Sequence, residues 1–172
     1  MKKIYISLLA ILCFALGLGL WYLIDYSPSD KSAVEIGQPA PKFFAPILTK
    51  PESGFTDQDL RGHYSLVNFW ASWCYSCIYE HKLLEKIKQS NDIQLYGINY
   101  MDSTEQAEQF LQTYGNPYTK VAEDQSGHLG IIWGVYGTPE SFVINPQGII
   151  VFHQTGPITP EIWNNKIKPL LR

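Results

Sequence analysis

The sequence predicts an α/β domain in which helices cover both faces of a mixed central sheet, preceded by one N-terminal transmembrane helix. Apolar strand-like runs alternate with helix-like runs through the middle of the chain, and a strand–helix–strand crossover implies a parallel pair of strands. Near the C-terminal end, Asn145-Pro146-Gln147-Gly148 separates two short apolar runs, which is a hairpin signal and implies an antiparallel pair. The chain has 172 residues, of which 45 % are apolar, so one domain of ordinary size can enclose a core.

The first expected strand ends shortly before two closely spaced cysteines, and the first expected helix begins at the first of them. Residues 65–70 form a short and largely apolar run, which predicts a buried strand. A helix is expected from Cys74 to about Gln89, with charged residues around one apolar face. That face consists of Leu83, Leu84 and Ile87.

The remaining elements are expected at regular intervals along the chain. They are a strand at 93–99, a helix opened by Ser103, short strands at 118–122, 141–144 and 149–153, a short helix at 129–135, and a C-terminal helix opened by Thr159 and Pro160. Serine and threonine suit the first position because their oxygens can accept a hydrogen bond from a free N–H of the first turn. Residues 37–48 contain three prolines, so we expect an extended segment without regular pairing, followed by a turn at 56–62.

The N-terminal segment is predicted to be a membrane anchor. Residues 4–24 contain no charged side chain and are long enough to cross a bilayer as a helix. Lys2 and Lys3 precede the run, so the positive-inside rule leaves the N-terminus in the cytoplasm and the rest of the chain outside. A cleaved signal peptide is the alternative, but the run is long for one and no small-x-small site follows it. The predicted organisation is a tail and anchor at 1–24, a linker at 25–35 and a domain at 36–172.

Cys74 and Cys77 are spaced as a thiol–disulfide site. A helix N-terminus carries unpaired N–H groups and a partial positive charge, which stabilise a thiolate, and the thiolate is the form that attacks disulfides. A loop of this length constrains the unfolded chain very little, so a structural disulfide is the weaker interpretation. A zinc site would need two further ligands at suitable spacing, and neither a second cysteine pair nor a His-x-x-x-His motif is present. The third cysteine, Cys13, falls in the predicted anchor.

Residues 70–77, followed by Glu80 and His81, resemble the CcmG/DsbE family of membrane-anchored thioredoxin-like proteins of cytochrome c maturation. Three further segments are similar to that family, and the match extends from about Gly37 to Leu170 and includes the anchor. These segments are Gly97-Ile-Asn-Tyr100 with Asp102, Gly115-Asn-Pro-Tyr118 and Gly134-Val-Tyr-Gly-Thr-Pro-Glu140.

The resemblance implies a thioredoxin-like fold and a periplasmic reductant without a cofactor. Such a protein would be a protein-disulfide reductase that gives electrons to disulfides of apocytochrome c, or of a partner that handles its thiols. It would be held in the cell inner membrane through residues 4–24 with its C-terminal domain in the periplasm. A membrane thiol–disulfide transporter of the DsbD or CcdA type would reduce it again, and the family suggests a monomer.

The resemblance also assigns roles around the cysteines. Cys74 would attack the substrate disulfide and form a mixed disulfide, which Cys77 would resolve to leave the Cys74–Cys77 disulfide. Cys74, at the mouth of the helix, is expected to be the more exposed of the two. Pro139 resembles the cis-proline that faces the cysteines in this fold, so the backbone of Thr138 could pair with an extended substrate.

Two carboxylates are further candidates for the site. Glu80 follows Cys77 by three residues and shares its helical face, so it could accept or relay a proton, although an ordinary solvated glutamate is the alternative. Asn68 stands where thioredoxins generally carry a buried aspartate that accepts a proton. Asparagine cannot do this, which favours Glu80. Glu140 is expected at the rim of the substrate groove, where it would select substrates by charge, or as an exposed acid without a function.

Aromatic and histidine side chains complete the candidate site. Trp70 and Trp73 are expected to pack over the sulfurs, and Trp73 to contact substrate in the groove as well. The Tyr75-Ser76 dipeptide departs from the family, whose members usually carry a proline between the cysteines, and leaves the reduction potential open. We expect the four histidines to be surface or core residues and not metal ligands; they are His63, His81, His128 and His153.

Other functions stay open at the level of sequence. One is an anchored reductase with a different client, in copper-site assembly or general periplasmic reduction. Another is a metal or haem chaperone, but covalent haem attachment needs a histidine directly after Cys77, where Ile78 stands. A peroxidase would place its reactive cysteine in a different motif. The formal net charge of −3 and the lack of a basic block make nucleic acid an unexpected partner.

Overall fold

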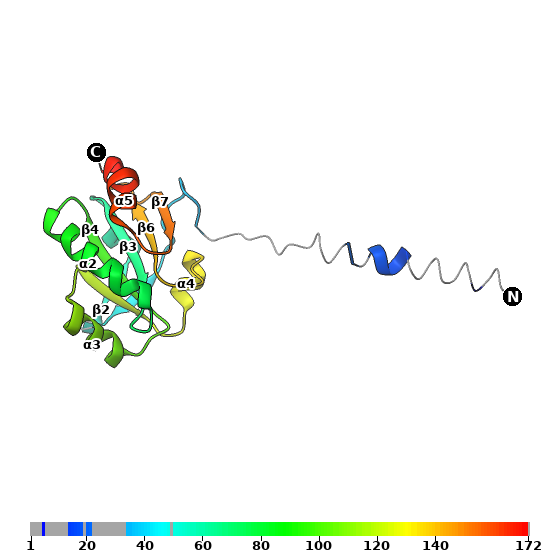
Figure 1. Ribbon diagram of the computed structural model, residues 1–172, viewed down its shortest axis with the longest axis horizontal. Coiled ribbons are helices and arrows are strands. Elements are labelled where there is room, and N and C mark those ends of the chain that lie inside the picture. Colours follow the sequence, from blue (N-terminus) through cyan, green and yellow to red (C-terminus); the bar gives the residue numbers. More distant parts are fainter. Residues whose placement is uncertain (1–4, 6–13, 19, 22–33, 49, 172) are drawn as a thin grey trace. The chain divides into compact units, whose positions relative to one another are not determined.

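A seven-stranded sheet in the order β2-β1-β5-β4-β3-β6-β7 forms the centre of the domain (Figure 1). The computed structural model describes residues 5, 14–18, 20–21, 34–48 and 50–171. The chain divides into two units, Met1–Lys31 and Ser32–Arg172, and the sheet belongs to the second. The strands are β1 (Phe44–Ile47), β2 (Lys50–Thr56), β3 (Ser65–Trp70), β4 (Gln94–Tyr100), β5 (Lys120–Asp124), β6 (Glu140–Ile144) and β7 (Ile150–Thr155).

Strand pairing in the sheet is mixed, as the sequence predicts. β3, β4 and β5 are parallel, whereas β6 pairs antiparallel with both β3 and β7. β3 lies between β4 and β6, and each of its six residues is buried. A strand that is covered on both faces reads as a continuous apolar run, and for this reason the sequence identified β3 within its true limits.

Helices cover both faces of the sheet, and Figure 1 shows α2 and α3, in green, apart from α4, in yellow. Because side chains alternate along a strand, Leu66 and Trp70 pack in the cluster that contains residues of α2 and α3, while Val67 and Phe69 pack in the cluster that contains residues of α4. Asn68 therefore faces α2. The helical elements are η1 (Asp57–Leu60), α2 (Tyr75–Ser90), α3 (Thr104–Tyr114), α4 (His128–Trp133), α5 (Pro160–Ile162), η2 (Trp163–Ile167) and η3 (Lys168–Leu170).

Both predicted helix caps are confirmed. The Ser103 hydroxyl accepts a hydrogen bond from the backbone N–H of Gln106, and the Thr159 hydroxyl accepts one from that of Ile162. Beyond α5 the C-terminal segment continues as a π turn and then a 3-10 turn, not as one regular helix. Pro169 lies in the last turn and has no N–H to extend a regular ladder.

The expectation of an unpaired segment at 37–48 is wrong for its last part. β1 pairs antiparallel with β2, and Ile47 also pairs with Ala122 of β5. Pro46 is tolerated because it lies beside a shift in the strand register. Ala45 and Phe55, paired across the hairpin, are fully buried, and this burial favours a strand despite the proline.

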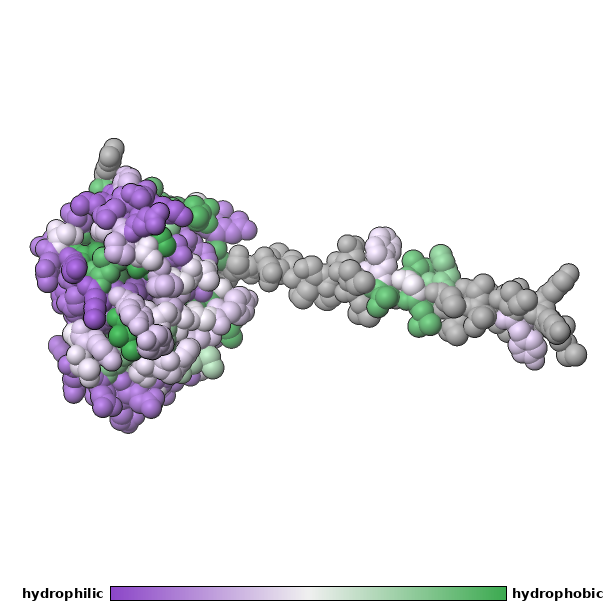
Figure 2. Space-filling model, viewed as in Figure 1, coloured by the Kyte–Doolittle hydropathy of each residue, from purple (hydrophilic) through white to green (hydrophobic). Residues whose placement is uncertain are grey.

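The predicted anchor at 4–24 and linker at 25–35 lie mostly outside the described residues. Among the residues that are described, no helix is both long and apolar enough to cross a membrane. On the face of the domain drawn in Figure 2, the described apolar residues form scattered spots among hydrophilic and intermediate ones.

Candidate active site

Cys74 and Cys77 form a disulfide where β3 leads into α2. Cys74 is the N-cap of the helix, and its Sγ accepts the backbone N–H of Cys77 at 3.2 Å. An N-cap normally offers an oxygen to this N–H, so here a sulfur occupies the place of the capping oxygen. The position exposes the sulfur of Cys74 to the positive end of the helix dipole, which favours a thiolate there once the disulfide is reduced.

Burial does not separate the two cysteines. Cys74 is 4 % exposed and Cys77 is 3 % exposed, so the exposure of the two residues does not decide which sulfur is the more accessible. Both belong to the core cluster that also contains Trp70 and Leu84. What distinguishes Cys74 is its place outside the first turn of α2 and the polar groups around its sulfur.

A groove of about 540 Å³ lies beside the cysteines. Ser76 of α2 lines it together with residues 134, 136–140, 153 and 155–157. The Thr138–Pro139 peptide bond is cis, as expected, and the Pro139 carbonyl accepts the N–H of Gly156 at 2.9 Å. The Thr138 hydroxyl is buried and has no partner within the part of the chain that the structure describes.

Glu140 is not an exposed acid at the rim, contrary to one of the sequence alternatives. It is buried, its Oε1 lies 2.5 Å from Nε2 of His153, and the Thr155 hydroxyl lies 3.5 Å from the same oxygen. The register between β6 and β7 sets Glu140 opposite Thr155, which places His153 on the same face of the sheet. All three residues line the groove. No local motif indicates this pair, because the register across the hairpin brings the two residues together.

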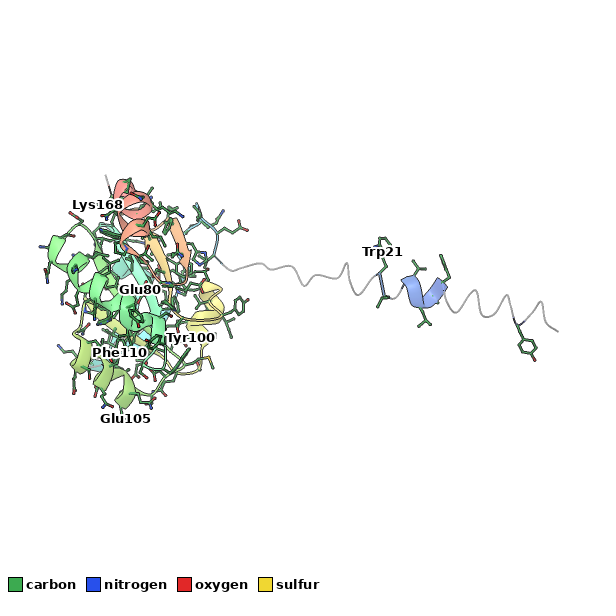
Figure 3. The ribbon with its side chains drawn as sticks, viewed as in Figure 1. Trp21, Glu80, Tyr100, Glu105, Phe110 and Lys168 are labelled. Atoms are coloured by element: carbon green, nitrogen blue, oxygen red, sulfur yellow. A yellow bond between two sulfur atoms is a disulfide. The ribbon has the colours of Figure 1, made fainter. Side chains whose placement is uncertain are left out.

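Glu80 projects from α2 toward the sheet and is only 2 % exposed (Figure 3). One carboxylate oxygen accepts the N–H of Ile158 at 2.8 Å, and the other accepts Nδ2 of Asn68 at 3.0 Å. Burial raises the pKa of Glu80 to about 7, and the two hydrogen bonds oppose that shift. The alternative of a solvated helix glutamate is therefore wrong.

Asn68 connects Glu80 to two further buried side chains. Its Nδ2 also donates to the Ser141 hydroxyl at 2.9 Å, and its Oδ1 accepts the Tyr118 hydroxyl at 2.7 Å. Burial raises the pKa of Tyr118 well above its ordinary value, so the phenol keeps its proton and acts as the donor. The amide oxygen of Asn68 must then face Tyr118, which leaves the amide N–H groups for Glu80.

Asp102 fixes the loop that precedes Cys74. Its carboxylate accepts the N–H and the hydroxyl of Ser72, the side-chain amide of Asn99 and the N–H of Ser103, at distances from 2.6 to 3.0 Å. Next to it, the Trp73 indole N–H donates to the Met101 carbonyl at 3.1 Å. The loop after β4 therefore holds the loop after β3, and with it the start of α2.

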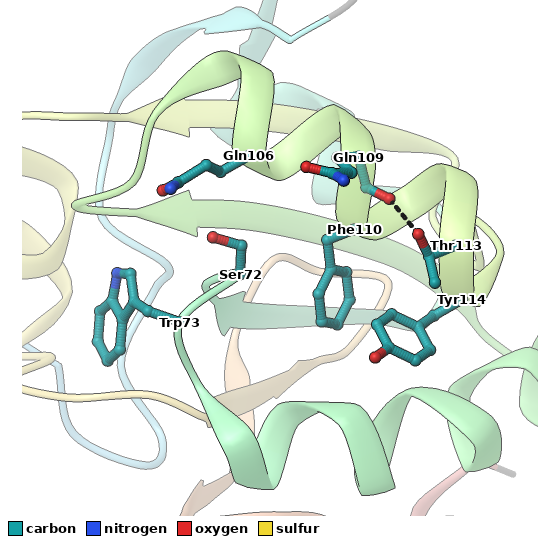
Figure 4. A pocket seen from close by; sticks show the side chains of 7 residues that line it. All are labelled: Ser72, Trp73, Gln106, Gln109, Phe110, Thr113 and Tyr114. Carbon is teal, nitrogen blue, oxygen red and sulfur yellow. Dashed lines mark hydrogen bonds between the residues drawn. The ribbon is translucent and has the colours of Figure 1, made fainter.

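Trp70 and Trp73 differ in their environments. Trp70 is buried in the core as expected, whereas Trp73 is 57 % exposed and does not bury its ring over the sulfurs. Figure 4 shows Trp73 at one end of a hollow of about 360 Å³, with Phe110 and Tyr114 of α3 at the other end. Trp73 is thus available for contact with a partner.

The four histidines are distributed through the domain. His63 and His153 contact side chains of Tyr96 and Glu140, and the ring of His81 donates to the Gly115 carbonyl at 2.7 Å. Burial lowers the pKa of His81, so the neutral ring is favoured inside the domain. Within the described ranges, no three of the histidine, cysteine and acidic side chains are grouped so that they could hold a metal ion.

Comparison with known proteins agrees with this geometry. The Redoxin family model matches residues 35–168. The chain is 39 % identical to the thiol:disulfide interchange protein DsbE of Allochromatium vinosum over 91 % of this chain and 87 % of that one. It is 36 % identical to DsbE of Escherichia coli strain K12, over 98 % of this chain and 93 % of the relative.

A crystal structure also shares the fold. It is that of a thioredoxin-family thiol:disulfide interchange protein from Chlorobium tepidum, with a TM-score of 0.64 and 23 % identity over 80 % of this chain and 99 % of that one. The disulfide at the start of α2, the cis-proline in the groove that Ser76 also lines and the matches over most of the chain agree with the expected family. The chain belongs to the Redoxin family and, within it, to the DsbE-type thiol:disulfide interchange proteins.

Proposed function

We propose that the protein is the reductant of a client disulfide in cytochrome c maturation, the client being apocytochrome c or a partner that handles its thiols. One observation carries the proposal: Cys74 caps α2 beside a groove that also contains the cis Thr138–Pro139 bond. This arrangement offers a stabilised thiolate next to a surface on which an extended chain can lie. The resemblance of residues 134–140 to the CcmG/DsbE pattern supports a client from this pathway.

The exchange takes two steps in which electrons and protons balance. The Cys74 thiolate attacks one sulfur of the client disulfide, so a mixed disulfide forms and the other client sulfur leaves as a thiolate, which takes up a proton. Cys77 then loses its proton and attacks Cys74, so the second client sulfur leaves and is protonated in turn. The products are the Cys74–Cys77 disulfide and a client dithiol that has gained two electrons and two protons.

Glu80 is our candidate to take the proton from Cys77. Both side chains lie on the buried face of α2, one helical turn apart. A carboxyl group whose pKa is about 7 is present in both protonation states at neutral pH, so it can accept a proton and later release it. The Asn68 amide, held by Tyr118, keeps Glu80 in position.

The groove is our candidate for client binding. An extended client could pair with the backbone of Thr138, which lines the groove. Pro139 shapes this wall, and the Glu140–His153 pair lies in the same groove, where a carboxylate would favour clients with a positively charged residue near the disulfide. Trp73, directly before Cys74 in the chain, offers an exposed ring for contact with a client.

We also propose that residues 4–24 hold the protein in the cell inner membrane as a single pass, with the domain in the periplasm. The uncharged run after Lys2 and Lys3 supports this orientation. The same location would give a membrane donor of the DsbD or CcdA type access to the Cys74–Cys77 disulfide. The protein would act as a monomer, because one chain supplies both cysteines and the groove.

Trapping tests the proposal directly. In cells that express Cys77→Ala, Cys74 can attack a client but cannot release it, so clients should accumulate as mixed disulfides that mass spectrometry identifies. Apocytochrome c or a thiol-handling partner of its maturation should be among them, and Cys74→Ala should trap nothing. If only copper-site or other periplasmic proteins are captured, the client class is wrong and the alternative of a reductase with another client is right.

A further inference from the structure

Ser76 places a hydroxyl group against the sulfur of Cys74. Its Oγ lies 3.6 Å from Cys74 Sγ, within hydrogen-bond range for a sulfur acceptor. Because this sulfur is bonded to Cys77, it carries no proton, and the hydroxyl must be the donor. Ser76 is the second residue of α2 and is half-buried, so the first turn of the helix holds its side chain beside the N-cap.

The sulfur of Cys74 therefore has two donors. The backbone N–H of Cys77 lies 3.2 Å away and the Ser76 hydroxyl lies on the helix residue before it. A hydrogen bond to an ionised acceptor is about twice as strong as one to a neutral acceptor. The hydrogen bond from the Ser76 hydroxyl is therefore stronger to a Cys74 thiolate than to the disulfide sulfur that it contacts in this structure.

We propose that Ser76 is a catalytic residue whose hydroxyl hydrogen-bonds to the Cys74 thiolate in the reduced protein. The inference rests on the proposed function, in which Cys74 is the attacking sulfur. Because the bond is stronger in the dithiol state than in the disulfide state, Ser76 stabilises the reduced protein. It keeps more of Cys74 ready to attack and makes the dithiol a milder reductant than the same fold would be without the hydroxyl.

The surroundings of Ser76 allow its effect to be separated from those of other groups. Glu140 and His153 line the same groove as Ser76, and Glu80 lies on the same helix with its carboxylate turned to Asn68 and Ile158. The Ser76 hydroxyl takes no part in the Glu140–His153 contact or in the hydrogen bonds of Glu80. A substitution that removes only this hydroxyl therefore leaves those contacts in place.

The test compares Ser76→Ala, Ser76→Thr and Ser90→Ala in the full-length protein. Ser90 ends the same helix and its hydroxyl donates to the Ile87 carbonyl, so it controls for the loss of a serine from α2. Two quantities are measured. The pH dependence of Cys74 alkylation, read by mass spectrometry on the peptide that contains Cys74, gives the pKa of its thiol. The equilibrium with glutathione gives the reduction potential.

Ser76→Ala should raise the pKa of the Cys74 thiol by about one, the size expected for one hydrogen bond to a charged group. Measured at a pH above the pKa of the Cys74 thiol in both proteins, the equilibrium with glutathione should move about tenfold toward the disulfide form, which corresponds to a potential about 30 mV more negative. Ser76→Thr keeps a hydroxyl and should restore both quantities. Ser90→Ala should change neither.

Changes below about twofold in Ser76→Ala, or equal changes in Ser90→Ala, would overturn the role of Ser76. A Ser76→Thr variant that behaves like Ser76→Ala would also count against the hydroxyl. If the wild-type dithiol does not exchange with glutathione at all, the proposed function fails, and the role of Ser76 fails with it. If the wild-type dithiol exchanges and only the Ser76 variants give the wrong result, the role of Ser76 alone fails.

Discussion

At the scale of single residues, the buried carboxyl group of Glu80 is the feature with the largest energetic consequence. An ionised group is costly to bury unless it is paired, and Glu80 accepts two hydrogen bonds but has no cation as a partner among the residues that the structure describes. The burial cost exceeds the gain from those bonds, and the pKa accordingly rises to about 7. The group is therefore poised to change its protonation at the pH at which the protein works.

This pKa shift predicts how stability depends on pH. The unfolded chain releases the Glu80 proton near pH 4.5, while the folded protein keeps it until about pH 7. Between these values Glu80 binds more protons in the folded state than in the unfolded state, so its contribution to stability falls as the pH rises, by about 3 kcal/mol over the whole window. The lowered pKa of His81 acts in the opposite direction near pH 6.5, so urea unfolding of the oxidised protein at several pH values must be compared with a variant that lacks the Glu80 carboxyl group.

The Glu80→Gln variant isolates the contribution. The difference in unfolding free energy between wild type and Glu80→Gln should change by about 3 kcal/mol from pH 4.5 to pH 7 and then level off. Glu105→Gln, on α3, alters an exposed carboxylate and should show no such change. A constant difference across the range would mean that Glu80 titrates as an ordinary surface acid.

The functional residues that the sequence revealed are those identified by a local motif. Cys74 and Cys77 are separated by two residues at a helix start, and Glu80 and Pro139 lie in segments with a family pattern. Their partners could not be found in this way. Tyr118 reaches Asn68 across 50 positions of sequence, and His153 reaches Glu140 across the β6–β7 hairpin, so both contacts depend on the strand order and register.

At the scale of elements, two loops at one edge of the sheet support each other. Asp102, between β4 and α3, accepts four hydrogen bonds, and two of them come from Ser72 in the loop that leads to Cys74. Asp102→Ala should therefore lower the unfolding free energy by about 2 kcal/mol, because buried donors lose their acceptor. Asp102→Asn keeps one acceptor oxygen and should cost less. A loss below about 0.5 kcal/mol in urea unfolding would contradict this role.

The start of α2 and the loop before β6 both present aromatic rings to solvent. Tyr75 is 72 % exposed and Tyr136, which lines the groove, is 81 % exposed. Exposed aromatic residues beside the reacting sulfur favour contact with a polypeptide client. Tyr75→Ala and Tyr136→Ala should each lower kcat/KM for a peptide disulfide about tenfold, while reduction of a small disulfide such as hydroxyethyl disulfide should stay unchanged.

A matched control for these tyrosines is Ile36→Ala. Ile36 is also exposed and apolar, but it precedes Gly37, whose N–H donates to Ile150 at the start of β7, away from the cysteines. It should alter neither substrate. Equal loss with peptide and small disulfides in the tyrosine variants would instead mean that the rings act on the dithiol itself.

Secondary structure was predictable where burial and local signals agreed. β3 and the caps of α3 and α5 follow from apolar runs and from serine or threonine at a helix start. The hairpin of β1 and β2 was not predictable, because Pro46 argues against a strand locally and only the burial of Ala45 and Phe55 in the folded domain outweighs it. The irregular C-terminal helix likewise depends on its packing through Trp163 and Ile167.

At the scale of the whole molecule, the domain contains the active site, and the N-terminal segment is proposed to determine where in the cell the protein is located. Val34 is the first described residue that joins the core, so the domain should fold without the segment before it. Deletion of residues 1–31 should leave the unfolding free energy within about 0.5 kcal/mol of the full chain and move the protein from the membrane fraction to the soluble fraction. A truncated protein that stays with the membrane would contradict the proposed anchor.

The central claim is that the Cys74–Cys77 dithiol reduces a client disulfide through Cys74. The most direct measurement mixes the reduced full-length protein with a synthetic peptide that contains an oxidised Cys-x-x-Cys-His motif, the haem-attachment pattern. Mass spectrometry should show one peptide disulfide reduced for each Cys74–Cys77 disulfide formed, and Cys74→Ala should leave the peptide oxidised. A peptide that remains oxidised while the wild-type dithiol remains reduced would contradict the account.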